Sequence, residues 1–238
     1  MISLYIHIPF CKSKCKYCDF LSFPNTEYMD NYKRALLSEI NSFDFNEPIK
    51  SIFIGGGTPS IIDSSVIVEI MESIKNHSID KNAEITIEAN PGTLTEDKLK
   101  AYRECGINRI SMGLQAWQND LLKKLGRIHT KDEFLYSFNM AKKYFDNINV
   151  DLMFSLPDQT MDMWLETLEN VTKLKPQHIS AYSLIVEEGT PFYIMDLNLP
   201  DEETDRKMYH TAIDFLENKG YHQYEISNFA QKGRESVH

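Results

Sequence analysis

The sequence predicts an α/β protein with a parallel sheet covered by helices, and two observations support this. Short β-rich runs alternate with amphipathic helical patterns six times along the 238 residues, which is typical of consecutive strand–helix units. Residues on six strand ends can converge on one centre only if the sheet curls like a barrel, whose carboxyl-terminal face carries the chemistry. The residues at or just after those six ends are Cys11, Gly55, Glu88, Gln115, Asp151 and Ser183.

Each predicted unit joins one strand-like run to one helical pattern. The strands are expected at 3–9, 51–55, 83–89, 109–115, 149–155 and 178–185. The helices that follow them are expected at 27–42, 66–75, 96–105, 131–145, 161–174 and 202–219, with only a short turn before the fourth. A last strand is expected at 222–229, and no low-complexity segment or Pro/Ser-rich linker divides the chain.

Three cysteines lie within eight residues near the start of the chain. Cys11, Cys15 and Cys18 have the spacing C-x3-C-x2-C, which is tight enough for one loop to aim three thiolates at one centre. Three thiolates suit an iron–sulfur cluster, although a [4Fe–4S] cube normally takes four. The fourth cysteine, Cys105, is far away at the end of a predicted helix. One iron would then be open to another ligand, which indicates a catalytic cluster.

Three plainer interpretations of the cysteines compete with a cluster. A structural zinc site normally has four ligands in paired spacings, and the nearby His7 lies on a predicted strand and reads as packed. Disulfides need an oxidising compartment, but the run MISLYIHIPF lacks the basic region of a signal peptide. Free core cysteines rarely come as a group flanked by lysines. The pattern favours a metal cluster.

The run YIHIPFCKSKCKYCDF resembles the signature of the radical SAM superfamily, in which an aromatic residue, here Tyr17, precedes the last cysteine. With seven further motifs, the chain resembles the oxygen-independent coproporphyrinogen III oxidases and, more closely, the HemW-type heme chaperones. The motifs are GGGTPS at 55–60, IEANPG at 87–92, RISMGLQA at 109–116, GRIH at 126–129, VDLMFSLPDQT at 150–160, ISAYSLIVEEGTP at 179–191 and YEISNFA at 224–230.

The resemblance implies a partial (β/α)6 barrel with an open side for a large substrate. It also implies a [4Fe–4S] cluster on Cys11, Cys15 and Cys18, with S-adenosylmethionine bound to the open iron. One electron from the cluster would break the S–C5′ bond and yield a 5′-deoxyadenosyl radical, while the protein orients the cofactors. The core domain is expected to span 1–238, with the barrel over about 1–220 and a short final strand at 222–229.

Two groups of residues suit S-adenosylmethionine near the predicted glycine loop. The resemblance assigns Gly56, Gly57 and Thr58 to the methionine amino group, although glycines also suit a plain tight turn. Glu88 ends a predicted strand with its carboxylate facing inward, where it needs a partner. Ribose hydroxyls or an ammonium group would serve, and a salt bridge to Arg109 is the plainer alternative.

The remaining contacts are expected on later strands and loops. Arg127 suits a bidentate contact with the methionine carboxylate, although a surface arginine is the plainer interpretation. Gln115 offers both a donor and an acceptor, and Asp151 suits a ribose contact. Packing against the cluster and the adenine is expected for Tyr5 and Tyr17, and backbone contacts with the adenine are expected for Ile185.

Two features favour the chaperones over the oxidases. The cysteine spacing of the oxidases resembles C-x3-C-x2-C-x-C, and Phe20 stands here at the position of the additional, last cysteine. They also carry a longer segment before the motif. HemW proteins continue beyond YEISNFA into a stretch resembling S-x-H-N-x-x-Y-W and a helical domain, whereas this sequence stops at His238. We therefore expect the C-terminal domain to be missing.

Composition limits the classes of partner. With 35 acidic and 25 basic residues, the net charge of −10 would repel phosphate backbones, so no nucleic acid is expected. Hydrophobic residues make up 42% of the chain, and no apolar run approaches twenty residues, so no membrane span is expected. Reduced cysteines without a targeting signal predict a cytoplasmic protein.

Three functions remain open on the sequence. A HemW-like chaperone would hold heme as cargo and pass it to heme-accepting proteins, with an electron donor such as a flavodoxin or ferredoxin. It would contact membranes only peripherally, through its acceptors. An oxidase would decarboxylate coproporphyrinogen III, and a non-catalytic iron–sulfur fragment would do neither. Phe20 favours the first over the second, while the use of radical chemistry is left undecided.

Overall fold

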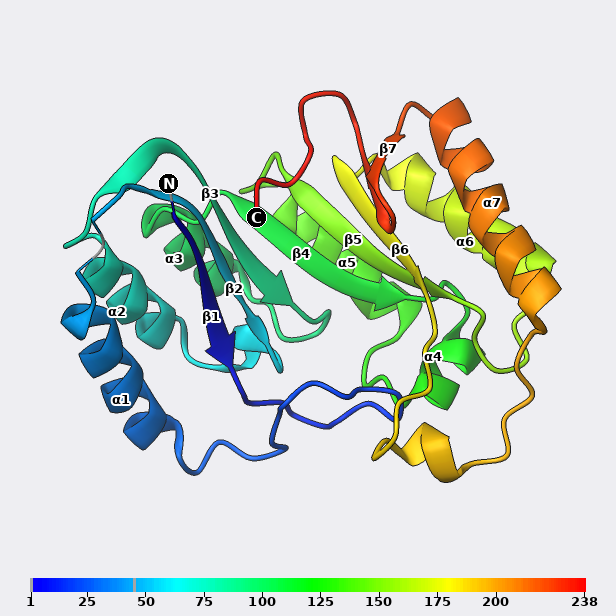
Figure 1. Ribbon diagram of the computed structural model, residues 1–238, viewed down its shortest axis with the longest axis horizontal. Coiled ribbons are helices and arrows are strands. Elements are labelled where there is room, and N and C mark those ends of the chain that lie inside the picture. Colours follow the sequence, from blue (N-terminus) through cyan, green and yellow to red (C-terminus); the bar gives the residue numbers. More distant parts are fainter. Residues whose placement is uncertain (1, 45) are drawn as a thin grey trace.

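The computed structural model describes residues 2–44 and 46–238 and contains a curled eight-stranded sheet (Figure 1). The strand order is β1-β2-β3-β4-β5-β6-β8-β7. Strands β1 to β6 pair in parallel, and β8 is antiparallel to both β6 and β7. The parallel strands are β1 (Ile2–Ile8), β2 (Ile49–Gly56), β3 (Ile79–Ala89), β4 (Arg109–Gln115), β5 (Ile148–Phe154) and β6 (His178–Ser183).

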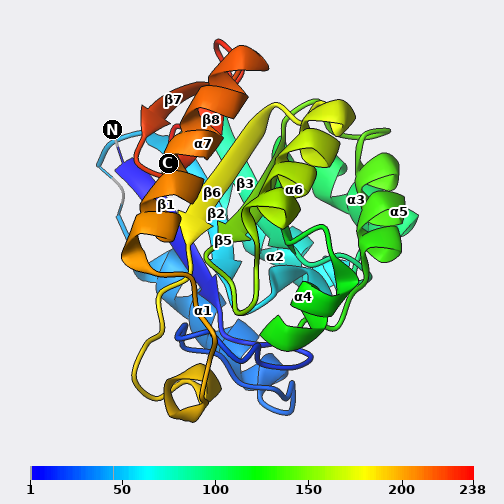
Figure 2. The ribbon, with the colours of Figure 1, turned by 90° about the vertical axis from the view of Figure 1, so that its right-hand side faces the viewer.

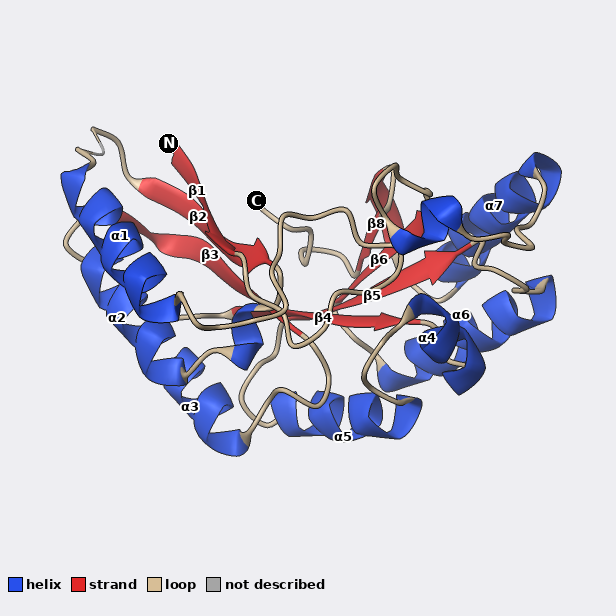
Figure 3. Ribbon diagram, turned by 90° about the horizontal axis from the view of Figure 1, so that it is seen from below, coloured by secondary structure: helices blue, strands red, loops and turns tan. Residues whose placement is uncertain are grey.

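Helices connect the strands and cover the convex side of the sheet, which leaves the concave side open (Figure 3). Short 3-10 helices lie at Pro59–Ile61 and Pro191–Ile194. The expected partial (β/α)6 barrel is confirmed. The α-helices are α1 (Met29–Ser42), α2 (Ser64–Ile74), α3 (Glu96–Glu104), α4 (Asn119–Leu125), α5 (Lys131–Ala141), α6 (Met161–Leu174) and α7 (Glu202–Asn218).

The structure corrects two of the predicted elements. The short turn expected after β4 is the helix α4, which buries Leu121, Leu122 and Leu125 and ends at Gly126 in the left-handed conformation. The single strand expected at 222–229 is a hairpin of β7 (His222–Glu225) and β8 (Asn228–Ala230). A turn breaks that run because the carboxylate of Glu225 accepts hydrogen bonds from within the turn and from Asn228.

Polar side chains fix where several helices begin. Thr95, Thr160 and Asp201 each accept a backbone N–H of the first turn of α3, α6 and α7, respectively. Helix α5 begins with a capping box, in which Thr130 and Glu133 satisfy each other's backbone N–H groups. Such caps stabilise a helix by about 1 kcal/mol each. They mark where the connections from the sheet end and the helices begin.

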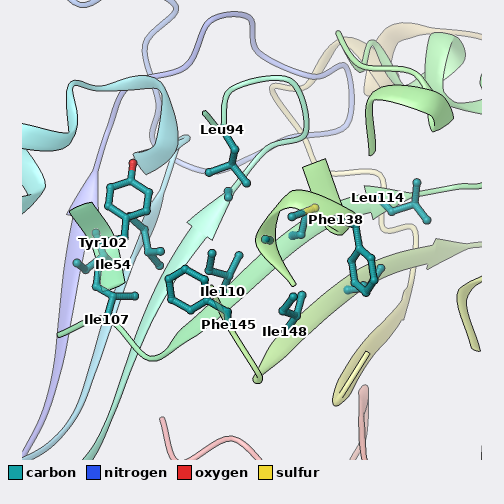
Figure 4. Close-up of a cluster of buried hydrophobic side chains, with 14 of the residues drawn as sticks. Ile54, Leu94, Tyr102, Ile107, Ile110, Leu114, Phe138, Phe145 and Ile148 are labelled. Carbon is teal, nitrogen blue, oxygen red and sulfur yellow. The ribbon is translucent and has the colours of Figure 1, made fainter. Parts of the chain in front are cut away.

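The convex side of the sheet carries the hydrophobic core. Side chains of a strand alternate between its two faces, and in β4 the core side chains are Ile110, Met112 and Leu114. Figure 4 shows Ile110 and Ile148 of the sheet with Phe138 and other buried side chains of this core. Figure 2 shows α7 in the foreground, and this helix contacts β5, β6 and β7.

The concave side carries a polar row instead. The register places Glu88 opposite Ser111, and Asp151 opposite both Gly113 and Ser180. The C-terminal segment ends in this hollow (Figure 3), where Ser236 donates a hydrogen bond to Glu84 at 2.7 Å. Polar groups from β3 to β6 therefore face one shared space. Within the described residues, no helix has the length and apolar character needed to cross a membrane.

Candidate functional site

The three clustered cysteines lie on the loop between β1 and α1. Backbone hydrogen bonds fix this loop: Cys11 N–H donates to Phe23 O, and Lys16 N–H donates to Leu125 O of α4. The turn between the other two cysteines is closed by Cys18 N–H and Cys15 O at 3.2 Å. All three are free thiols. The loop is therefore held at both ends, with its cysteines over the carboxyl-terminal edge of the sheet.

The glycine loop after β2 packs directly against the cysteine loop. Gly57 N–H donates to Ile8 O and Thr58 N–H donates to Phe10 O, both at 2.8 Å. A Cβ atom at Gly57 would lie 2.6 Å from Phe10 O and 3.0 Å from Cys11 Sγ. Since side-chain atoms do not approach backbone that closely, only glycine permits this contact. The backbone at Gly57 therefore lies in close contact with the cysteine loop.

One cavity of about 630 Å³ opens at this edge of the sheet and gathers most of the predicted residues. It is large enough for a nucleoside-containing ligand beside a cluster. Tyr5 is the predicted residue that does not line it. The predicted residues that do line it are Cys11, Cys15, Tyr17, Cys18, Gly56, Gly57, Thr58, Glu88, Gln115, Arg127, Asp151 and Ile185.

Arg127 brings a positive charge to the wall of this cavity. Its guanidinium donates hydrogen bonds to Gly113 O at 2.9 Å and to the side-chain oxygen of Asn90, and Nη1 lies 3.7 Å from Cys15 Sγ. It forms no ion pair with a carboxylate in the described part of the chain, and its buried Nε has no hydrogen-bond partner there. A half-buried cation that has no carboxylate partner among the described residues fits an anionic ligand. The surface interpretation of Arg127 is wrong.

Two carboxylates face the cavity from β3 and β5. Glu88 accepts a hydrogen bond from Gly56 N–H at 3.1 Å, and Asp151 accepts one from Ser111 Oγ at 3.0 Å. Burial, and then the negative charge of Asp151, raises the pKa of Glu88 from 4.5 to about 8. A cationic ligand would relieve this repulsion because it stabilises both ionised carboxylates.

The other predicted residues complete the wall and the rim. Gln115 accepts a hydrogen bond from Tyr182 O–H at 2.9 Å, which leaves its amide N–H donors directed elsewhere. Tyr17 packs against the hydrophobic cluster around α4. Ile185 lies at the rim and is 68% exposed. The wall therefore offers amide donors, hydroxyls and apolar surface around the charged groups.

Two expected relationships differ in the structure. Tyr5 donates a hydrogen bond to His7 at 3.2 Å and stacks on Phe53 outside the cavity lining. Arg109 lies beside Glu84 and not Glu88, with 4.0 Å between the charged atoms. The register of β3 and β4 explains this, because it sets Thr86 opposite Arg109 and so shifts the guanidinium away from the strand end. The salt-bridge alternative for Glu88 is wrong.

The sequence interpretation missed residues that hold the predicted ones in place. Asn90 contacts Arg127 and also donates a hydrogen bond to Thr58 at 2.8 Å. Asn149 donates to Asp151 at 2.7 Å. Both carried a signal: Asn90 lies in the IEANPG motif directly after β3, and Asn149 lies two residues before Asp151, on the same face of β5.

The donor set fits an iron–sulfur cluster better than a single metal ion. Within residues 2–44 and 46–238, no group of three or more His, Cys, Asp or Glu side chains is arranged to hold one metal ion. The three cysteines nevertheless line one cavity, and thiolates around a multi-iron cluster lie further apart than the ligands of one ion. Cys105 cannot join them, since it ends α3 in the convex core and donates to Tyr102 O.

Comparison with known families decides what this site belongs to. The family model of the radical SAM superfamily matches residues 5–171, which include the cysteine loop, the glycine loop and both carboxylates. The chain belongs to the radical SAM superfamily. This superfamily implies a [4Fe–4S] cluster and S-adenosylmethionine. The cavity, the cysteine loop and the positive charge of Arg127 fit those two groups.

Curated relatives place the chain more closely. It is 44% identical to "Heme chaperone HemW" of Buchnera aphidicola subsp. Schizaphis graminum and 42% identical to that of Bacillus subtilis, over its full length. The chain spans 65% and 66% of these relatives, slightly less than two thirds of their length. It is 36% identical to the Escherichia coli HemW, of which it spans 65%.

Solved structures share the fold. The Escherichia coli coproporphyrinogen III oxidase HemN, described as a radical SAM enzyme, superposes with a TM-score of 0.89 and 29% identity. The match covers 98% of this chain and 56% of that one. Methylornithine synthase PylB superposes with a TM-score of 0.64 at 15% identity, over 90% of this chain and 62% of that one, and shows the fold alone.

Proposed function

We propose that this chain is the cluster-binding and S-adenosylmethionine-binding part of a heme chaperone of the HemW kind. The observation that carries the proposal is the match, over the full length of the chain, to curated HemW chaperones at up to 44% identity. The cavity supports it, because the predicted cofactor residues converge there. The proposal has two parts, the cofactor site and the cargo.

The cofactor site begins with the cysteine loop. Cys11, Cys15 and Cys18 would hold the [4Fe–4S] cluster and leave one iron without a protein ligand. When bound, the cluster and S-adenosylmethionine supply reductive cleavage of the S–C5′ bond. The protein fixes the loop through the glycine loop and α4 and keeps Arg127 against Cys15.

The remaining residues orient S-adenosylmethionine. Arg127 forms no ion pair with a carboxylate among the described residues, and its guanidinium binds the methionine carboxylate. Glu88 and Asp151 accept hydrogen bonds from the cationic and hydroxylated parts of the ligand. Gln115 donates from its amide N–H groups, because its oxygen is already bonded to Tyr182. Each polar edge of the ligand then meets a group of complementary charge or hydrogen-bonding type.

The cargo is heme, which passes to heme-accepting proteins. Two exposed apolar side chains stand at the mouth of the cavity: Phe20 is 69% exposed and Ile185 is 68% exposed. An apolar rim beside a polar interior suits a large planar macrocycle with a charged edge. A reduced flavodoxin or ferredoxin would supply electrons to the cluster, and contact with membranes would come through the acceptors.

The alternative function is oxygen-independent oxidation of coproporphyrinogen III, favoured by the structural similarity to HemN. Phe20 argues against the oxidase function, because the cysteine pattern of the oxidases has a further cysteine at this position. Both functions use the same cofactor site. They differ in whether a porphyrin ligand is converted or only held.

The test compares the two reactions under one set of conditions. The chain is reconstituted with iron and sulfide without oxygen, and is then given S-adenosylmethionine, a reductant and either heme or coproporphyrinogen III. We expect heme retention, read from the Soret band against the full-length Bacillus subtilis relative, and no protoporphyrinogen IX. Formation of protoporphyrinogen IX would replace the chaperone proposal with the oxidase. If the chain neither retains heme nor converts coproporphyrinogen III, it is an iron–sulfur fragment with neither function.

A further inference from the structure

A chain of hydrogen bonds runs through the sheet from the final hairpin to Asp151. Tyr224 OH on β7 lies 2.7 Å from His178 Nε2 on β6. His178 Nδ1 lies 2.6 Å from Asn149 Oδ1 on β5, and Asn149 Nδ2 lies 2.7 Å from Asp151 Oδ1. At the outer end, Ser236 N–H donates to Tyr224 OH at 3.1 Å. Four segments that are distant in sequence thus meet behind one carboxylate.

The orientation of the Asn149 amide follows from its partners. Its Nδ2 contacts two acceptors, Asp151 Oδ1 and, at 2.8 Å, Ser111 Oγ. Ser111 must accept there because its own proton goes to the other carboxylate oxygen of Asp151. The amide N–H₂ therefore faces Asp151, and the amide oxygen faces His178. An amide turned the other way would place its oxygen against the carboxylate.

The protonation of His178 follows in turn. An amide oxygen cannot donate, so Nδ1 of His178 carries the proton and Nε2 accepts from Tyr224 O–H. The side chain is 1% exposed, and burial together with the nearby Arg109 charge lowers the pKa of His178 to about 3. The ring is thus neutral and held as one tautomer. All hydrogen bonds of the chain then point the same way, toward Asp151.

We propose that Asn149 and His178 are positioning residues for Asp151, and that Tyr224 of the final hairpin acts on the S-adenosylmethionine site through them. The proposal rests on the proposed function, in which Asp151 contacts that ligand. Hydrogen bonds fix the orientation of the Asp151 carboxylate. Asn149 and Ser111 each donate to one of its oxygens, which sets the plane of the carboxylate and leaves other lone pairs for ribose hydroxyls.

The experiment measures the dissociation constant of S-adenosylmethionine in the reconstituted chain by titration, with iron content and thermal midpoint recorded for each variant. We expect Asn149→Ala to weaken binding about tenfold and Tyr224→Phe about two- to tenfold. In an Asp151→Ala background, neither change should weaken binding further. Tyr221→Phe is the matched control, because its hydroxyl donates to Pro176 O at 2.7 Å outside the chain and should leave affinity unchanged.

A second readout does not need the ligand. The ¹⁵N spectrum of the imidazoles should show neutral His178 with its proton on Nδ1 in the wild type, and a changed signal in Tyr224→Phe. Full losses that persist in the Asp151→Ala background, or a His178 proton on Nε2, would overturn the proposal. Unchanged affinity in both single variants would also overturn the proposal. If Asn149→Ala fails to fold, the affinity of Tyr224→Phe decides alone. A wild type that keeps its iron but binds no S-adenosylmethionine would instead remove the proposed function.

Discussion

Nη1 of Arg127 lies 3.7 Å from Sγ of Cys15, so the residue expected to bind the methionine carboxylate also touches a cysteine expected to hold the cluster. The same guanidinium donates to Gly113 O at the end of β4 and to Asn90 after β3. One positive charge thereby joins the cysteine loop to two strand ends. The cysteine loop and the expected ligand site therefore share one side chain, that of Arg127.

Removal of this charge should separate ligand binding from cluster binding. We expect Arg127→Leu to weaken S-adenosylmethionine binding by about tenfold or more, because a hydrogen-bonded ion pair with the carboxylate is lost. Iron content should remain, since the three thiolates are unchanged. Isothermal titration of the reconstituted protein measures the affinity. Arg103→Leu, on the convex side in α3, is the control, and equal affinities in the two variants would contradict the assignment of Arg127.

The glycine loop should be as sensitive as the cysteines themselves. We expect Gly57→Ala to lower iron content after reconstitution, because the new methyl group would meet Phe10 O and Cys11 Sγ at 3.0 Å or less. Gly106→Ala serves as the comparison: it strains a positive φ, but its Cβ would have no neighbour within 4 Å. If both variants hold the same iron as the wild type, the loop contact does not shape the site.

The raised pKa of Glu88 predicts a pH dependence of stability. Folding raises this pKa from 4.5 to about 8, first through burial and then through Asp151. The folded state therefore holds the proton more tightly than the unfolded chain, so the stabilisation is complete below 4.5 and is lost as the pH rises through about 8. The thermal midpoint of the ligand-free protein should fall between about pH 6 and about pH 9.

Substitution of this carboxyl should flatten that profile. Glu88→Gln cannot ionise, so its thermal midpoint should change less over the same range. Glu104→Gln removes an exposed carboxyl at the end of α3 and should behave like the wild type. Parallel pH profiles for the wild type and Glu88→Gln would mean that Glu88 titrates near its ordinary pKa.

Much of the fold was predictable because two periodicities are strong. The alternation in β4 separates Ile110 and Met112 from Ser111, and the helix α6 begins and ends at the predicted residues Met161 and Leu174. Helix α4 was not predicted, because seven residues are too few for a clear helical period. The final hairpin was missed because its turn contains no glycine or proline.

The site was predictable where a motif or a strand end carries the side chain. Glu88 lies one residue before the end of β3, whereas Asp151, which is expected at a strand end, lies in the middle of β5. Asn149 and His178 stand near the starts of β5 and β6 and are not among the predicted site residues. Their role depends on the register of β5 and β6, which sets Asn149 opposite His178. The alternative that paired Glu88 with Arg109 was wrong for the same reason. Register arises from tertiary packing, which local sequence does not encode.

The EPR spectrum of the reduced, reconstituted protein with and without S-adenosylmethionine tests the central claim most directly. A cluster on Cys11, Cys15 and Cys18 with one open iron predicts close to four irons per chain and a spectrum that changes at saturating ligand. Replacement of any one of these three cysteines by Ala should abolish the EPR signal of the cluster, whereas Cys105→Ala should retain it. An unchanged spectrum on addition of ligand, or loss of the cluster in Cys105→Ala, would contradict the account.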